Sequence, residues 1–185
     1  MTQEIRFLTW RFTLRDALVL GFCATFIVLT RAALRLHFSL PGHSMFFMMF
    51  FLLMARGCVP KIGAVTLVGF ISGLVCLLLG MAKLGPFVVV NFVLPAVVVD
   101  VAGLIYPRMV TSYLACILVG AAASATKGVS RILVDYVMGM ETSIVLWHVF
   151  TATIASVIFG ALGATMVPPV ARRLQANNLI PSATE

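Results

Sequence analysis

Charged residues are scarce in this chain of 185 residues. Lys and Arg number 13 and Asp and Glu number 6, whereas 62% of the residues are hydrophobic and the mean hydropathy is +1.11. A water-soluble fold would lack the polar side chains needed to cover its surface, and a disordered segment contains far fewer apolar residues. The composition therefore excludes both classes and predicts an integral membrane protein.

Several chemical motifs are also missing. The sequence has no GxxxxGK[ST], GxGxxG or HExxH motif, and its four cysteines form no CxxC pair. It therefore offers no P-loop for ATP and no spacing typical of zinc ligands. We expect no enzyme activity, no cofactor and no metal. The net charge of +7 comes from single or paired bases between apolar blocks, which fits lipid head groups better than nucleic acid.

Six apolar blocks have the length of membrane spans. A span needs about 20 apolar residues, and these blocks lack the alternation of barrel strands. We therefore expect one membrane domain over 1–185, an all-α bundle of six transmembrane helices followed by a cytoplasmic tail over 168–185. The expected spans are about 17–36, 44–59, 62–82, 87–106, 109–126 and 143–167.

The distribution of bases predicts the orientation of the bundle. Cytoplasmic segments carry the excess of Lys and Arg, and an internal N-terminus places eight bases inside and five outside. The chain is therefore expected to have both ends in the cytoplasm. The inner set is Arg6, Arg11, Arg15, Arg56, Lys61, Arg108, Arg172 and Arg173. The outer set is Arg31, Arg35, Lys83, Lys127 and Arg131.

Small residues recur at four-residue spacing in four of the blocks. Such stripes let helices approach closely in lipid, where apolar surfaces gain nothing by associating. Internal packing is the simpler explanation for Gly69/Gly73, for Gly120/Ser124 and for Ser156/Gly160/Ala164. For the stripe of Ala17, Gly21 and Thr25 in the first block, internal packing and contact with a partner protein are equal alternatives.

A set of polar and aromatic residues belongs to the outer half of the expected bundle. Together they predict an outward-facing pocket for a small polar heteroaromatic or anionic solute. These candidate substrate-binding residues are His43, Lys83, Asn91, Lys127, Arg131, Trp147 and His148.

Four of these residues also have a simpler explanation. Trp147 suits an interfacial aromatic belt, His148 suits an interhelical hydrogen bond, and the bases near Asp135 suit a solvated face. Asn91 and Asp100 are nine residues apart, which places them on opposite faces of a straight helix, although Pro95 between them could bend it.

Several motifs are distributed over most of the chain. They are Pro41-Gly42-His43, the segment from Arg56 through Lys61-Ile-Gly63-Ala64 to Gly69, and Lys83-Leu-Gly85-Pro86, Leu94-Pro95 and Val99-Asp100. In these motifs the chain resembles a known family of membrane proteins, the substrate-binding S components of energy-coupling factor (ECF) transporters. The arrangement is similar to the branch associated with thiamine precursors such as hydroxymethylpyrimidine.

The resemblance implies an uptake subunit for a vitamin or related micronutrient in a prokaryotic inner or plasma membrane. It implies a transmembrane coupling subunit and two ATPase subunits as partners, and a pocket covered by the loop between the first two helices. Ala17, Gly21 and Thr25 would correspond to the family's AxxxA surface, with glycine at the second alanine. The alternatives are a structural or assembly subunit of another membrane complex, and an intramembrane enzyme using Ser72 or His148.

Overall fold

The structure is a computed structural model that describes residues 12–37, 43–81, 85, 87–106, 109–137 and 142–177. All regular elements in these ranges are helices. Six long helices are followed by a short seventh, and a 3-10 helix, η2 (Met109–Thr111), precedes α5. The bounds are α1 Leu14–His37, α2 His43–Cys58, α3 Ala64–Leu78, α4 Phe87–Ile105, α5 Tyr113–Val137, α6 Thr142–Thr165 and α7 Val167–Ala176.

The lengths and surfaces of these helices are those of a membrane protein. Among the described residues, four stretches are long and apolar enough to cross a membrane, in α1, α4, α5 and from α6 into α7, while α2 and α3 are apolar but shorter. Large apolar side chains, including Ile105, Leu114 and Leu118, project outward with 69–80% of their surface exposed. Such a surface suits lipid rather than water. The expected all-α, multi-pass membrane protein is confirmed.

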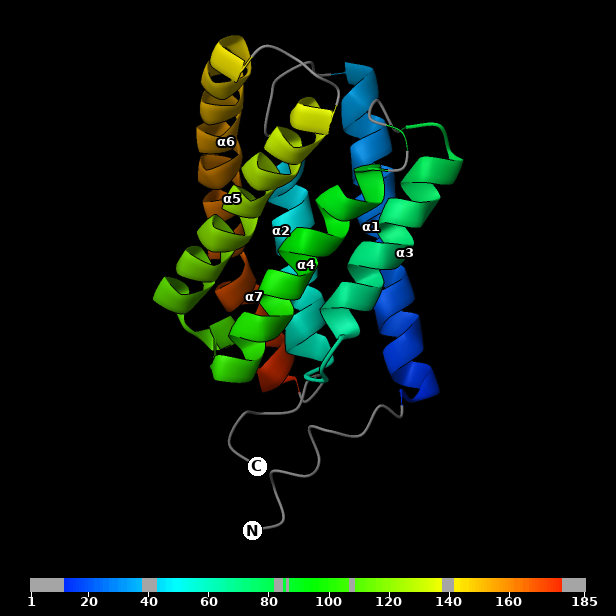
Figure 1. The fold of residues 1–185 in the computed structure, drawn as a ribbon. Helices are drawn as coiled ribbons and strands as arrows, with labels where there is room; N and C mark the ends of the chain where they lie inside the picture. Colours follow the sequence, from blue (N-terminus) through cyan, green and yellow to red (C-terminus); the bar gives the residue numbers. More distant parts are fainter. Residues whose placement is uncertain are drawn as a thin grey trace.

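Successive long helices run in alternating directions (Figure 1). The beginning of α1 and the whole of α7 lie at one end of the bundle, which we call the proximal end. The opposite, distal half therefore contains the last turns of α1, α3 and α5 and the first turns of α2, α4 and α6. This arrangement decides which polar residues can meet.

Three of the small-residue stripes, those of α3, α5 and α6, are used in packing between helices. A Cβ atom added to Gly69 of α3 would lie 2.6 Å from Cβ of Ala96 and 2.8 Å from the carbonyl oxygen of Phe92 in α4. A Cβ atom added to Gly120 of α5 would lie 2.7 Å from Cβ of Ala164 in α6. These separations are below van der Waals contact, so only glycine permits such close approach.

The stripe on α1 is different, because the described residues do not pack against it. None of their atoms lies within 4 Å of a Cβ added to Gly21, and Ala17 and Thr25 are exposed among them. The hydroxyl of Thr25 donates a hydrogen bond to the carbonyl oxygen of Gly21 at 2.8 Å, so its polar group is satisfied within the helix. The face is therefore small, apolar in character and open.

Two expected segments, the span over 109–126 and the tail over 168–185, have different bounds from the helices observed. Instead of a span over 109–126, residues 109–111 form η2 and α5 continues from Tyr113 to Val137. Lys127 and Arg131 end an apolar window, but both residue types favour helix, so the helix does not stop there. The segment expected as a tail over 168–185 begins inside α7, with proline at its first helical positions, where proline is favoured.

Candidate functional site

A hydrogen bond between buried polar side chains joins α4 and α5 in the distal half. Ser130 Oγ donates to Asn91 Oδ1 at 2.7 Å, and the two residues are 2% and 5% exposed. Asn91 lies about one turn into α4, and Ser130 lies near the distal end of α5. The amide nitrogen of Asn91 takes no part in this bond, and its two N–H groups are hydrogen-bond donors.

Lys127 lies one turn before Ser130 on the same face of α5. It is only 8% exposed, although its helix is apolar enough to be a membrane span. An ionisable group inside a span costs about 2.5–3.5 kcal/mol on insertion scales, so such groups are usually retained for function. The continuation of α5 beyond the expected boundary places this cation inside the bundle rather than in a loop.

Arg31 adds a second cation from α1. Its guanidinium carbon lies 4.6 Å from the centre of the Phe92 ring in α4, and the Phe92 side chain is fully buried. The quadrupole of an aromatic ring attracts a cation placed over its face. From the sequence, Arg31 is expected only to be one of the outer bases that indicate the orientation of the bundle. The signal that could have identified it is its position in the last third of an apolar helix, where a long side chain can reach inward.

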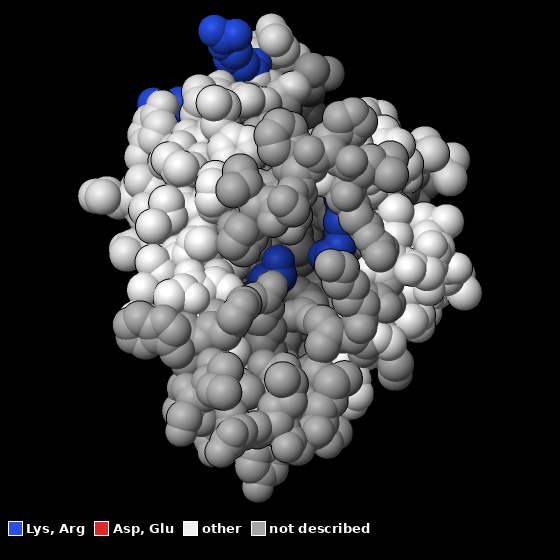
Figure 2. All heavy atoms as spheres, turned by 90° about the horizontal axis from the view of Figure 1, so that it is seen from above, with Lys and Arg blue, Asp and Glu red and all other residues white. Residues whose placement is uncertain are grey.

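We call Arg31, Asn91, Lys127 and Ser130 the distal polar layer. They come from α1, α4 and α5, and their polar atoms are a guanidinium, an amide, an ammonium and a hydroxyl. Figure 2 looks onto this end of the bundle and shows two groups of Lys and Arg atoms recessed near the centre of the face. The groups available here suit recognition of a polar solute through hydrogen bonds and charge.

Of the predicted site residues, the structure describes the side chains of two, Asn91 and Lys127. Asn91 and Lys127 both belong to the distal polar layer. His43, Trp147 and His148 start or lie near the start of α2 and α6, and Arg131 lies near the end of α5, so all four belong to the distal half. Their side chains, and the whole of Lys83, are outside the described residues. Their roles stay predictions.

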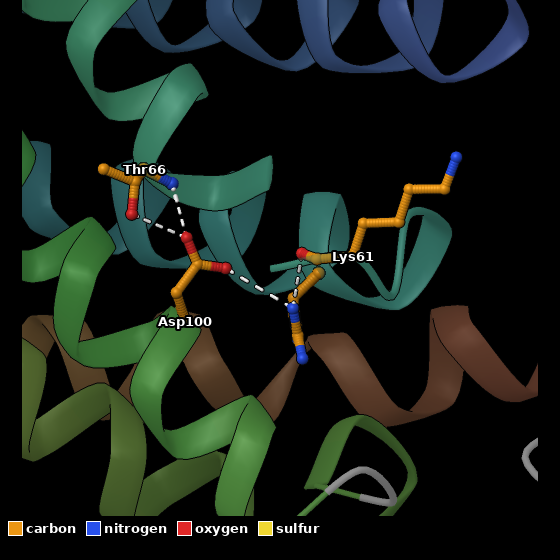
Figure 3. Close-up of polar contacts among 4 residues, drawn as sticks. Lys61, Thr66 and Asp100 are labelled. Atoms are coloured by element: carbon orange, nitrogen blue, oxygen red, sulfur yellow. Dashed lines mark hydrogen bonds and ion pairs between the residues drawn. The ribbon is translucent and has the colours of Figure 1, made fainter. Parts of the chain in front are cut away.

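Asp100 lies in the proximal half, in a separate cluster (Figure 3). Its carboxylate accepts hydrogen bonds from the Thr66 backbone N–H at 2.8 Å, from the Thr66 hydroxyl at 2.6 Å and from Arg56 Nη1 at 3.4 Å. Asn91 and Asp100 thus serve different contacts, as their spacing predicted. Gly63 has no side chain to cap α3, so Asp100 of α4 takes that role at the positive end of the helix.

The Arg56 guanidinium completes the proximal cluster. Its Nη1 also donates to the Lys61 carbonyl oxygen at 2.7 Å, and a Cβ atom added to Gly103 would collide with its Nε. Lys61 in turn pairs with Asp16 at 2.6 Å, which ties the start of α1 to the loop before α3. Both ends of each bond are protein groups, so this cluster is structural: it holds the proximal ends of α1 to α4 together.

The described residues offer little for catalysis. No three His, Cys, Asp or Glu side chains in the described ranges come together to hold a metal ion. Ser72 is fully buried, and its Oγ lies 3.5 Å from the Ala24 carbonyl oxygen, so it packs α3 against α1.

No protein-family model and no curated protein sequence matches the chain. Its fold does match a solved structure, the crystal structure of an S-component of an ECF transporter, with a TM-score of 0.66. The match covers 91% of this chain and 88% of the other, at 17% sequence identity. The chain therefore has the fold of an ECF transporter S-component.

Proposed function

We propose that this chain is the solute-binding membrane subunit of an ECF-type importer and captures a vitamin or related micronutrient from outside the cell. The observation that carries the proposal is the distal polar layer, enclosed by α1, α4 and α5 in a bundle with the fold of an S-component. A hydrogen bond between buried side chains, a buried lysine one turn away and an arginine over a buried ring together supply the donors and charge that suit a polar solute.

Uptake against a gradient needs a source of energy such as ATP hydrolysis. This sequence has no P-loop motif for binding ATP. The proposal therefore includes a transmembrane coupling subunit and two ATPase subunits. The solute must be bound tightly in the outward state and weakly in the partner-bound state, because a ligand with equal affinity for both states shifts neither. The positive-inside distribution of bases supports a cytoplasmic proximal end, with the distal polar layer facing outward.

The coupling subunit is proposed to bind the face of α1 formed by Ala17, Gly21 and Thr25. The three other small-residue stripes are closed by neighbouring helices, whereas no atom of the described residues lies within 4 Å of a Cβ atom added to Gly21. Close approach by a partner helix would use the same packing principle as α5 and α6.

The remaining predicted residues are proposed to complete the solute site. His43, Lys83, Arg131, Trp147 and His148 belong by sequence to the same end of the bundle as the distal polar layer. An aromatic and an imidazole group would suit a heteroaromatic ring, as in the thiamine-precursor branch that the sequence resembles. Hydroxymethylpyrimidine is accordingly among the first solutes to test.

Thermal unfolding of the full-length protein in detergent tests the proposal. A ligand present at 100 times its Kd stabilises the native state by about 2.7 kcal/mol, which is a measurable rise in Tm. We expect one compound in a panel of water-soluble vitamins and their precursors to raise the Tm at micromolar concentration. If no compound in the panel does so and none co-purifies, the chain is better described as a structural subunit of another complex.

A further inference from the structure

We propose that the proximal end of the bundle binds an acidic phospholipid, and that Arg172 of α7 holds the phosphate of its head group beside Tyr113 of α5. The inference goes beyond the proposed function and does not depend on the identity of the solute. It comes from the level of the membrane surface at this end, from the fixed position of the Arg172 guanidinium and from the charges around it.

Two tyrosines lie at the edge of the apolar surface, where α4 ends and α5 begins (Figure 1). Ile105 and Leu114 are large apolar residues with 80% and 75% of their surface exposed, which suits contact with lipid tails. Tyr106 and Tyr113 adjoin them and are 49% and 44% exposed. Tyrosine is enriched where a bilayer meets water, because its ring is apolar and its hydroxyl is polar. The two tyrosines therefore mark the level of the lipid head groups at the proximal end.

Arg172 is held at this level by contacts with two other elements. Its guanidinium carbon lies 5.2 Å from the centre of the Tyr113 ring, and its Nη2 donates a hydrogen bond to the Thr111 carbonyl oxygen of η2 at 2.9 Å. The α7 helix is itself anchored, because Val167 and Ala171 are 0% and 1% exposed. Arg172 is exposed, yet its position is set by α7, η2 and α5 together. A cation over an aromatic face is held there by the ring quadrupole.

These contacts leave the positive charge of Arg172 in place, since a carbonyl group and a tyrosine ring are both neutral. The two carboxylates that the structure describes, Asp16 and Asp100, form ion pairs with other bases. Arg173, the next residue of α7, is also exposed and adds a second positive charge. The described surface of α7 therefore carries an excess of positive charge, which attracts anions.

A phospholipid fits this surface better than a soluble anion does. The guanidinium of Arg172 has N–H groups that match the oxygens of a phosphate. Leu114 follows Tyr113 on the lipid-facing side, so an acyl chain attached to that phosphate would meet apolar surface, whereas a soluble anion would gain nothing from it. The bases at this end support a cytoplasmic location, where acidic lipids give the membrane surface its negative potential.

The experiment measures lipid binding by the full-length protein in a neutral detergent. Native mass spectrometry compares phosphatidylglycerol with phosphatidylcholine of the same acyl chains, and glycerol 3-phosphate tests a soluble phosphate. The variants are Arg172→Gln, which removes the charge, and Tyr113→Leu, which removes the ring beside the guanidinium and keeps the net charge. Lys61→Gln is the control, because it lowers the net charge equally at a base that is paired with Asp16.

We expect wild type to bind phosphatidylglycerol at least about fivefold more tightly than phosphatidylcholine. Arg172→Gln should remove most of this preference, Tyr113→Leu should reduce it, and Lys61→Gln should leave it intact. The inference is overturned if wild type binds both lipids equally, if Lys61→Gln has the same effect as Arg172→Gln, or if glycerol 3-phosphate binds as tightly as the lipid.

A protein partner is the other class that could use these bases. If Arg172→Gln keeps the lipid preference and no longer co-purifies with ATPase subunits, the inference is overturned in favour of a protein contact. Should Arg172→Gln not fold, the wild-type comparison and Tyr113→Leu decide the matter, because an unchanged preference in Tyr113→Leu would also overturn the inference.

Discussion

The Arg31 guanidinium carbon lies 4.6 Å from the centre of the Phe92 ring, which brings α1 and α4 together in the distal half. Phe92 also packs against α3, since its backbone carbonyl borders Gly69. One aromatic residue thus connects a cation of the proposed solute site with the tight α3–α4 contact. The α1 helix therefore has two different faces. One face contributes Arg31 to the distal polar layer, and the other, around Gly21, has no described residue packed against it.

Asn91→Ala is expected to weaken solute binding by about tenfold, because it removes hydrogen-bond donors from the distal polar layer. The bundle should stay folded, since the Ser130 hydroxyl can donate to a carbonyl of its own helix. Titration of the purified variant with the identified solute measures the effect. Ser72→Ala, which removes a buried hydroxyl at the α1–α3 contact, is the control. Equal affinity in wild type and Asn91→Ala would remove Asn91 from the site.

Gly21→Leu is expected to prevent assembly with a coupling subunit while solute binding remains. Among the described residues no atom lies within 4 Å of the new Cβ, so the Tm of the isolated subunit should be unchanged. Co-purification with the coupling and ATPase subunits measures assembly. Ala122→Leu enlarges an exposed small residue on α5 and should assemble normally. Normal yield of the complex with Gly21→Leu would contradict the proposed interface.

Gly120→Leu should behave in the opposite way. Its Cβ would lie 2.7 Å from Cβ of Ala164 and 3.1 Å from the Gly160 carbonyl oxygen, so α5 and α6 must separate. Overpacking of this kind costs about 1–3 kcal/mol or more. The expected result is a lower Tm in detergent than for Gly21→Leu. The same Tm for both variants would show that the α5–α6 contact is looser than described.

Asp100→Asn is expected to destabilise the bundle strongly. It leaves the buried Arg56 guanidinium without its carboxylate, and loss of one partner of a buried pair costs about 3–5 kcal/mol. Asp16→Asn is the matched control, because the Asp16–Lys61 pair is partly exposed and such pairs contribute about 0–1 kcal/mol. Thermal unfolding of both variants gives the comparison. Similar losses of Tm in the two would contradict the structural role of Asp100.

The apolar blocks, and the charged, proline and glycine residues between them, were enough to predict the helical class of the protein and the positions of most of its long helices. The boundary of α5 was missed because a charged residue ends an apolar window without ending a helix. Lys127 and Arg131 are good helix formers, so α5 continues to Val137. The sequence did not predict α7, because its residues are more polar than those of a membrane span. Its two prolines also suggest the end of a helix, although proline is favoured at the first positions of a new one.

The site was predictable only in part, because spacing along one helix does not identify partners on another. Helical phase correctly separated Asn91 from Asp100. It could not show that Asn91 bonds to Ser130, a serine with no distinguishing pattern, or that Asp100 caps α3 in place of Gly63. Arg31 was assigned by its charge to the membrane surface, whereas its long side chain reaches an aromatic ring inside the bundle. These contacts depend on tertiary packing.

Mass spectrometry of the small molecules extracted from the freshly purified full-length protein tests the central claim most directly. The account predicts one micronutrient-sized compound in near-stoichiometric amount with wild type, and its loss from the Asn91→Ala/Lys127→Gln double variant. A compound recovered in equal amount from both proteins would contradict the account, because the solute would then be bound away from the distal polar layer.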